Sequence, residues 1–199
     1  WDQARTYGHF RLHDSSLVHR RGKPSCESFS DFCNQNALGL LAAAPLSMGL
    51  LTDRKNPEWH PANGSDLAEA CRKAANYCSD LGVNIANLAI LFSMSHPNLP
   101  CTILGMKSVT EVRAAASIAK RFQRVDWSLP GLTQDLILSF VLSPQEQKAY
   151  AILSDSETGP FAGVWKRTNE GDYDGDTVAY TPKYQWNGIR EAQSGRASS

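Results

Sequence analysis

The hydrophobic pattern predicts three β-strands with helices between them. The clearest strand covers residues 40–44, where apolar side chains run almost without interruption up to Pro45, which cannot donate to a sheet ladder. A run that is apolar on both faces is typical of a strand in a parallel sheet covered by helices. Residues 101–104 repeat this plan, and imperfect alternation predicts another strand over residues 5–10. We therefore expect an α/β protein with a parallel sheet.

Capping residues mark where several helices are expected to begin. Each is a serine or an asparagine placed directly before a segment with apolar side chains at helical spacing. These residues are Ser65, Asn84, Ser108 and Ser143. Pro144 occupies the first helical position after Ser143 and strengthens that assignment, because proline is favoured there. In the helix after Ser65, small side chains recur at helical spacing and are expected to form its inner face; they are Ala68, Cys71, Ala75 and Cys78.

A further helix is predicted between the first two strands. Ser25 is its candidate N-cap, and Glu27 would lie favourably in its first turn. Phe29, Phe32 and Cys33 recur at helical spacing, so we expect these side chains to pack against the sheet.

Composition argues against several classes of partner. The 20 basic and 20 acidic residues balance, so no net field attracts nucleic acid or an anionic membrane. No apolar run approaches the roughly 20 residues of a membrane helix, and no segment resembles a signal peptide. The five cysteines do not form a paired framework, which favours free thiols in a reducing compartment. We therefore expect a cytoplasmic protein without nucleic-acid or membrane partners.

Two loops that follow predicted strands carry the candidate chemistry. Residues 45–49 are small or flexible enough to let backbone N–H groups approach a ligand closely. The other loop contains Gly105, and the helix that begins after Ser108 would direct its free N–H groups and positive dipole end at an anion. Together the two loops predict a clamp for phosphate groups.

These loops resemble those after the last two strands of the aldo-keto reductases. Residues 44–52 and 103–108 carry the resemblance, and order and spacing agree from about residue 6 to about residue 122. Two shorter pieces, residues 57–62 and 186–189, resemble the L-galactose dehydrogenase-like branch of that family. The resemblance implies an NAD(P)-dependent oxidoreductase that acts on an aldose, an aldehyde or a sugar.

The resemblance also implies a partial fold. A complete (β/α)8 TIM barrel takes about 250 residues, whereas this chain has 199. We therefore expect a fragment with the C-terminal portion of the barrel, about strands six to eight with their helices, over residues 1–157. Residues 158–199, and more broadly the segment from Asp155 on, are expected to form an irregular, extended C-terminal tail. The alternative is a non-catalytic remnant or interaction module of the same fold.

The resemblance implies which residues would hold the cofactor, NADP or NAD. They are Pro45, Leu46, Ser47, Met48, Gly49, Leu51, Leu104, Gly105, Met106, Lys107, Ser108 and Glu111. Lys107 stands where the family often has an arginine on the 2′-phosphate, and a lysine suits a phosphate monoester as a point charge. Lys107 therefore favours NADP, whereas Glu111 and Ala115 replace the Gln and Asn that the family often has near the adenine.

No catalytic residue is assigned, because the family's Tyr, Lys, Asp and His come from earlier strands than those expected here. No metal site is assigned either. His9, His13 and Asp14 are followed by no further ligand at zinc spacing. The segment 172–176 is similar to a calcium loop, but Lys183 stands where that loop needs a bidentate glutamate.

The segment 53–64 is predicted to be a surface loop because it is rich in Pro, Asn and charge. Two roles remain open for its aromatic residues. Trp59 and His60 would form part of a cover over the cofactor, or Trp59 would be a simple packing anchor.

Overall fold

The structure is a computed structural model, and it describes residues 2–18, 28–56 and 58–162. The strands are β1 (Gln3–Tyr7), β2 (Gly39–Ala43) and β3 (Cys101–Ile103). The α-helices are α1 (Phe29–Gln35), α2 (Asp66–Asp80), α3 (Ile85–Met94), α4 (Val109–Arg121), α5 (Gln134–Val141) and α6 (Pro144–Ser154), with short 3₁₀ turns η1 (Ser47–Gly49) and η2 (Phe122–Arg124). The candidate cap Ser25, the calcium-like segment and the piece 186–189 lie outside the described residues.

The three strands form one parallel sheet in the order β1-β2-β3. Gln3 pairs with Gly39, and Leu41 pairs with Cys101. The predicted parallel pairing of the last two strands is therefore confirmed. Parallel neighbours need a long crossover, which α2 and α3 supply between β2 and β3.

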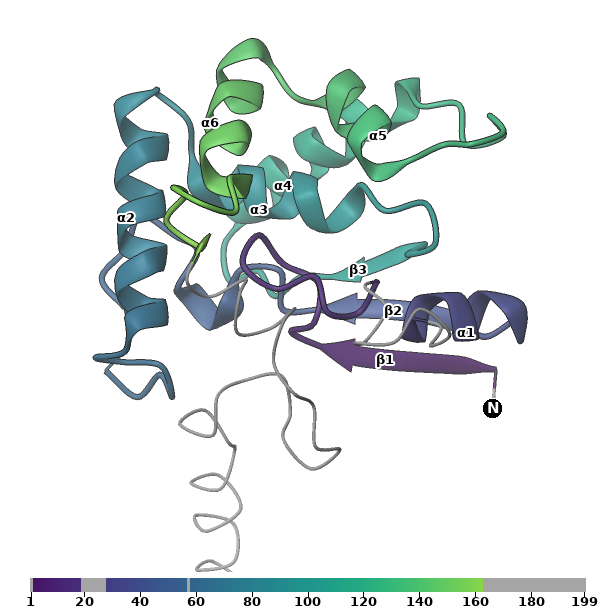
Figure 1. Cartoon of the computed structure of the whole chain (residues 1–199), viewed down its shortest axis with the longest axis horizontal. Coiled ribbons are helices and arrows are strands. Elements are labelled where there is room, and N and C mark those ends of the chain that lie inside the picture. The colour runs from purple at the N-terminus through teal and green to yellow at the C-terminus, as the bar shows by residue number, and fades with distance from the viewer. Residues whose placement is uncertain (1, 19–27, 57, 163–199) are drawn as a thin grey trace, which may run out of the picture.

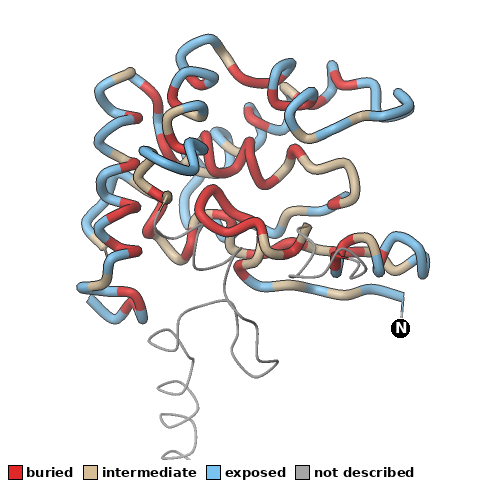
Figure 2. The backbone as a smooth tube through the Cα atoms, in the orientation of Figure 1, coloured by how far each residue is buried: buried red, intermediate tan, exposed pale blue. Residues whose placement is uncertain are grey.

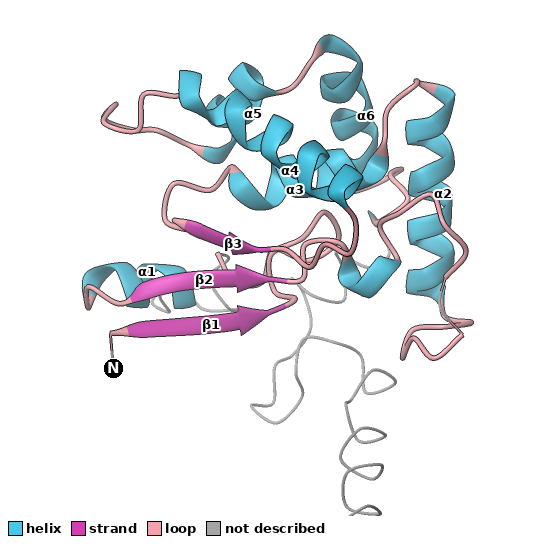
Figure 3. Cartoon of the chain, turned by 180° about the vertical axis from the view of Figure 1, so that it is seen from behind, coloured by secondary structure: helices cyan, strands magenta, loops and turns pink. Residues whose placement is uncertain are grey.

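Figures 1 and 3 show how the helices surround this small sheet. Helices α3 to α6 gather on the β3 side, α2 stands beyond the carboxyl ends of the strands, and α1 lies beside β2. The core lies along α3, whose Leu88, Ala89 and Leu91 have no exposed surface (Figure 2). Among the described residues, β1 has a strand neighbour on one side alone, so it forms a sheet edge.

The first strand is shorter than predicted. It ends at Tyr7, because Gly8 adopts a left-handed φ of 81° and the Arg11 guanidinium occupies the space that a Cβ on Gly8 would need. The segment after Gly8 forms a turn in which Arg11 and Asp14 bridge each other. The prediction of a strand up to residue 10 is therefore wrong beyond Tyr7.

Helix α1 turns a different face to the sheet from the one predicted. Its N-cap is Ser28 and its first-turn acidic residue is Asp31, with which Ser28 makes a capping box, so the prediction of Ser25 as cap and Glu27 in the first turn is wrong. Ser30 and Cys33 face inward, whereas Phe29 and Phe32 are about half exposed and stack on each other at 6.3 Å. Phe29 and Phe32 are three residues apart and so share a face that points away from the core. The prediction that both rings pack against the sheet is wrong.

The other predicted caps are confirmed. In each, the side chain accepts a hydrogen bond from the amide three residues later; these caps are Ser65, Asn84, Ser108 and Ser143. The apolar segment before Ser143 is helix α5, capped by Thr133. Beyond α6, residues 155–162 are not extended: Asp155 accepts hydrogen bonds from the next turn, and Phe161 is fully buried.

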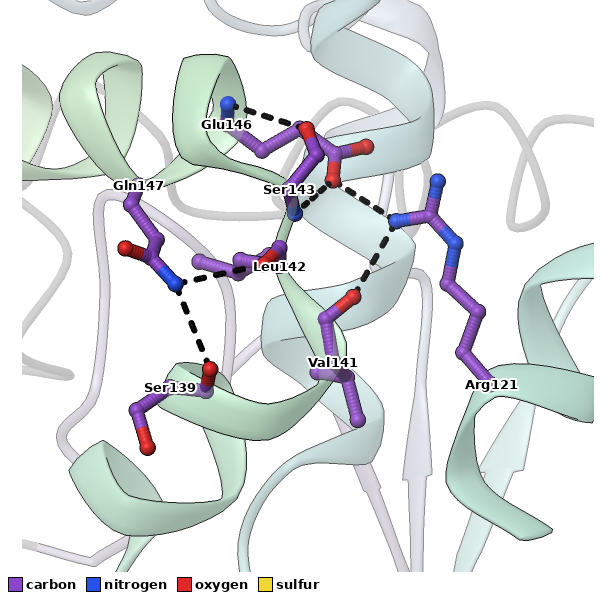
Figure 4. A network of polar contacts seen from close by, with 7 residues as sticks. All are labelled: Arg121, Ser139, Val141, Leu142, Ser143, Glu146 and Gln147. Carbon is purple, nitrogen blue, oxygen red and sulfur yellow. Dashed lines mark hydrogen bonds and ion pairs between the residues drawn. The ribbon is translucent and has the colours of Figure 1, made fainter. Parts of the chain in front are cut away.

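A polar network ties α4, α5 and α6 together (Figure 4). Arg121 donates to the Glu146 carboxylate at 2.7 Å and to the Val141 carbonyl at 3.2 Å. The same Glu146 oxygen accepts from the Ser143 amide at 2.7 Å, and the Ser143 hydroxyl accepts from the Glu146 amide. One buried carboxylate thus joins the end of α5 to the start of α6.

No single helix in the described part of the chain is long and apolar enough to cross a membrane. Helices α2 and α3 taken together have the length and apolar composition of a membrane span, but they are bent by 105° at the break between them.

Candidate functional site

The two loops singled out from the sequence lie next to each other. Ala43, the last residue of β2, pairs with Ile103, the last residue of β3. Because the strands are parallel, the loops that leave them emerge from the same edge of the sheet. In open α/β sheets, this carboxyl edge is where ligands usually bind.

The loop after β2 has a strained backbone. Three non-glycine residues in it are left-handed, Ala44, Ser47 and Met48, with φ values of 62°, 49° and 54°. Gly49 follows with φ 105°. Left-handed backbone at a non-glycine residue costs of order 1–3 kcal/mol and persists where the surroundings hold it, often at ligand-binding sites.

Many amides of this loop are already used inside it. Ser47 N–H donates to the Ala44 carbonyl, and Gly49 and Leu51 N–H donate to the Leu46 carbonyl. Leu50 N–H donates to the Ser47 carbonyl. These bonds shape the loop but leave those four amides without a free hydrogen for a ligand, so the predicted set of open backbone donors is smaller than expected.

Ser47 is the centre of a buried polar cluster. Its hydroxyl oxygen accepts from the Arg11 guanidinium at 2.9 Å and lies 2.6 Å from Nε2 of His13. The tautomer of His13 decides which atom donates in this second contact, because the Ser47 hydroxyl can donate one hydrogen bond and accept two. Burial and, next, the charge of Arg11 hold the pKa of His13 well below its ordinary value. His13 is thus neutral at physiological pH.

His60 reaches the same residue from the loop between β2 and α2. Its Nδ1 accepts from the Ala62 amide at 2.9 Å, so its Nε2 carries the hydrogen and donates to the Ser47 carbonyl at 3.0 Å. These contacts define one neutral tautomer. Burial lowers the pKa of His60; the bond to the Ser47 carbonyl acts in the opposite sense, and the charge of Arg11 lowers it further.

The second loop presents donors around a carboxylate. Glu111, in the first turn of α4, accepts from the Lys107 amide at 2.8 Å through one oxygen and from the Arg54 guanidinium at 3.0 Å through the other. The hydrogen bond from the Lys107 amide, followed by that from Arg54, lowers the pKa of Glu111. Two donors from the two loop regions therefore converge on an oxyanion, which the chain itself supplies.

The twelve residues predicted to hold the cofactor differ in how accessible they are. Pro45, Ser47 and Leu51 are buried, so their side chains face the protein rather than solvent. Gly105, Met106, Lys107 and Ser108 are exposed, and a Cβ built on Gly105 would meet open space. The remaining members are partly exposed; they are Leu46, Met48, Gly49, Leu104 and Glu111.

The two aromatic residues of the surface loop 53–64 differ in their exposure to solvent. Trp59 is 70% exposed, whereas His60 is buried. A packing anchor would be buried, so the structure does not favour that role for Trp59. The pattern of the sequence indicated neither Arg54 nor Arg11 as a member of the site, because their partners lie 57 and 36 positions further along the chain.

Several other side chains that could bind a metal or react as nucleophiles are held in structural contacts or buried; they are His9, Asp14, Cys71 and Cys78. Asp14 accepts from the Ser16 amide at 3.0 Å, and His9 lies 3.9 Å from Asp14. Among the described residues, no three His, Cys, Asp or Glu side chains gather as a metal site. Burial raises the pKa of Cys71 to about 12 and that of Cys78 to about 11, which suppresses the reactive thiolate.

Comparison with known proteins matches the segment that contains both loops to one family. The sequence model of the Aldo/keto reductase family matches residues 24–128, which is more than half of the chain. The chain belongs to the aldo/keto reductase family.

Within that family, the chain is similar to L-galactose dehydrogenase of Arabidopsis thaliana, with 32% identity over 111 residues. The matched segment covers 56% of this chain and 32% of that relative. The chain therefore spans about a third of the length of the relative it matches. The predicted resemblance to the family and to its L-galactose dehydrogenase-like branch is confirmed.

Proposed function

We propose that this chain carries the cofactor-phosphate loops of an NAD(P)-dependent aldo-keto reductase that acts on an aldose, aldehyde or sugar. The chain would then supply the C-terminal portion of the barrel, with β1, β2 and β3 in the places of strands six to eight. The observation that carries the proposal is the convergence of Arg54 and the Lys107 amide on one oxyanion at the start of α4. A phosphate oxygen has the same charge and accepts the same hydrogen bonds as the Glu111 carboxylate.

The residues at this edge fit a nicotinamide dinucleotide. The loop after β2 would border the pyrophosphate, and the exposed segment from Gly105 to Ser108 would take the adenosine end. When bound, such a cofactor exchanges hydride with a carbonyl or alcohol substrate. The part proposed for this chain is to bind and orient the cofactor, and no residue at this edge is assigned to proton transfer.

We expect Lys107→Ala to weaken NADP binding by roughly tenfold and to leave NAD binding nearly unchanged. The ammonium is exposed beside the start of α4, and NADP differs from NAD by a 2′-phosphate. The Glu111 carboxylate is held at the Lys107 amide and repels that phosphate, so the preference of the unmodified chain for NADP is expected to be modest. Fluorescence titration with both reduced cofactors measures the two affinities.

Lys120→Ala is the matched control, because it removes the same charge near the other end of α4. It is expected to change neither affinity. Equal losses of NADP and NAD affinity in Lys107→Ala would mean that Lys107 contacts a part common to both cofactors. No change for either would remove Lys107 from the site.

We also expect no turnover from the pure 199-residue chain. The three adjacent strands of the described residues do not close a barrel, and within that part of the chain the outer edges of β1 and β3 have no strand partner and are open to pairing with other chains. Spectrophotometric assays with NADPH or NADH and a panel of aldehydes and sugars should give rates equal to the blank, and sedimentation analysis should reveal self-association. Cofactor oxidation above the blank that scales with protein concentration would contradict this expectation.

A further inference from the structure

Ser47 is held from three directions, although it lies in a short surface-bordering loop. The Arg11 guanidinium and the His13 ring bind its hydroxyl, and the His60 ring binds its carbonyl. All four side chains are buried or nearly so, with exposed fractions between 0% and 6%. The three partners come from two segments that are remote in sequence, the turn after β1 and the loop before α2.

This arrangement stabilises a backbone that would otherwise relax. Ser47 and Met48 both have left-handed φ values, which are unfavourable for residues that carry a side chain. Burying an arginine and two imidazoles is itself costly unless every polar atom is directed at a partner. Several buried polar groups therefore hold one strained turn in a defined shape. This turn lies at the carboxyl edge of the sheet, where a ligand would contact it.

We infer that His60 is a positioning residue for the loop 45–49. Its ring is oriented by the Ala62 amide and donates to the Ser47 carbonyl, which fixes the left-handed turn and hence the surface that the loop offers to a ligand. The identity of that ligand as a nicotinamide cofactor rests on the proposed function. The effect of His60 on the loop itself does not.

The positioning depends on the neutral form of the ring. Protonation would place a second hydrogen on Nδ1, directed at the Ala62 N–H, and so disrupt the bond that orients the ring. Arg11 and His13, from the turn after β1, are the charged and titratable groups that face His60, and Cys71 of α2 lies near Arg11. The pKa of His60 lies below its ordinary value of 6.5 because of burial, so the positioning is intact at neutral pH and is lost as the pH falls through this lowered pKa.

The test compares the full chain with His60→Ala, His60→Gln and Asn63→Ala. Glutamine can donate through Nε2 to the Ser47 carbonyl and accept from the Ala62 amide, but it does not titrate. Asn63 lies in the same loop, is exposed and bonds to the Glu58 carbonyl, so it controls for any change in this segment. Hydrogen exchange measures protection of the Gly49, Leu50 and Leu51 amides, which donate within the turn.

We expect His60→Ala to lower the protection of these three amides by roughly five- to tenfold, the loss that follows from removing one buried hydrogen bond. His60→Gln and Asn63→Ala should match the unmodified chain at pH 7.5. Between pH 7.5 and 5, protection corrected for intrinsic exchange should fall in the unmodified chain and stay constant in His60→Gln. NAD affinity should follow the same pattern, since the pyrophosphate of NAD keeps its charge over this range.

Unchanged protection in His60→Ala would overturn the inference. If that variant does not fold, identical pH profiles of the unmodified chain and His60→Gln would overturn it equally. Failure of every variant, and of the unmodified chain, to bind NAD would count against the proposed function alone, because loop protection is measured without cofactor.

Discussion

Leu91→Ala is expected to lower the free energy of unfolding of the chain by about 2–5 kcal/mol. Leu91 lies in α3 with no exposed surface. Helix α3 contacts α2, α4, α5 and β3, so a cavity at Leu91 opens at the junction of most of the described elements. Domains are commonly stable by about 5–15 kcal/mol, so the loss is a large share of the total. Urea denaturation followed by circular dichroism measures it.

Leu136→Ala provides the comparison for this truncation. Leu136 is also a helical leucine, in α5, but it is 40% exposed. Its truncation removes less buried surface and leaves a position that solvent can fill, so the expected loss is below about 1 kcal/mol. Equal losses for the two variants would show that α3 is not the centre of the core.

Glu146→Ala is expected to lower the free energy of unfolding by roughly 2–3 kcal/mol. The carboxylate binds Arg121 at 2.7 Å and completes the capping box of α6 (Figure 4). Removing it leaves the Ser143 amide without its acceptor and the Arg121 guanidinium without its ion pair, although Arg121 keeps its bond to the Val141 carbonyl. Arg121 is 40% exposed, so water compensates for part of the loss and the full cost of breaking a buried pair is not reached.

This contribution should depend on pH. Burial alone would raise the pKa of Glu146, but the hydrogen bonds from Arg121 and Ser143 outweigh it and bring the pKa below the ordinary 4.5. A lowered carboxyl pKa stabilises the folded chain above pH 4.5, and the stabilisation is lost as the pH falls through the folded-state pKa. The difference in stability between the unmodified chain and Glu146→Ala should therefore shrink between pH 5 and pH 3. A difference that stays constant over this range would exclude the charged contact as its source.

Glu69→Ala is the control for a surface ion pair. Glu69 lies 3.1 Å from Lys73 on α2, but both side chains are more than half exposed. Exposed pairs at this spacing contribute about 0.3–0.5 kcal/mol, so this variant should be close to the unmodified chain in stability.

Part of the candidate site could be predicted from the sequence because its elements are local. Pro45 lies within a few residues of the end of β2, and Gly105 lies within a few residues of the end of β3. A parallel sheet then brings the ends of β2 and β3 together without further information. The loops at residues 45–49 and 105–108 are adjacent for this reason.

The rest of the site depends on pairs that are distant in sequence. Arg54 meets Glu111 and Arg11 meets Ser47 only after the chain has folded. A sequence pattern shows that a histidine is present, but not whether it lies on the surface, as predicted for the loop that contains His60, or in a buried cluster, as the structure has it. Side-chain burial and partner choice are tertiary properties, so the role of His60 became visible only in the structure.

The sequence by itself determined where α2, α3, α4 and α6 begin, because a capping side chain and its amide partner are three residues apart, as at Ser65 and Ser108. It also determined the parallel order of the strands and the family. The tertiary structure decided which faces are buried: Phe29 and Phe32 point outward, and Phe161 enters the core. It alone decided that the loop after β2 is held in a strained turn, because the side chains that hold it converge from segments that meet only when the sheet is packed.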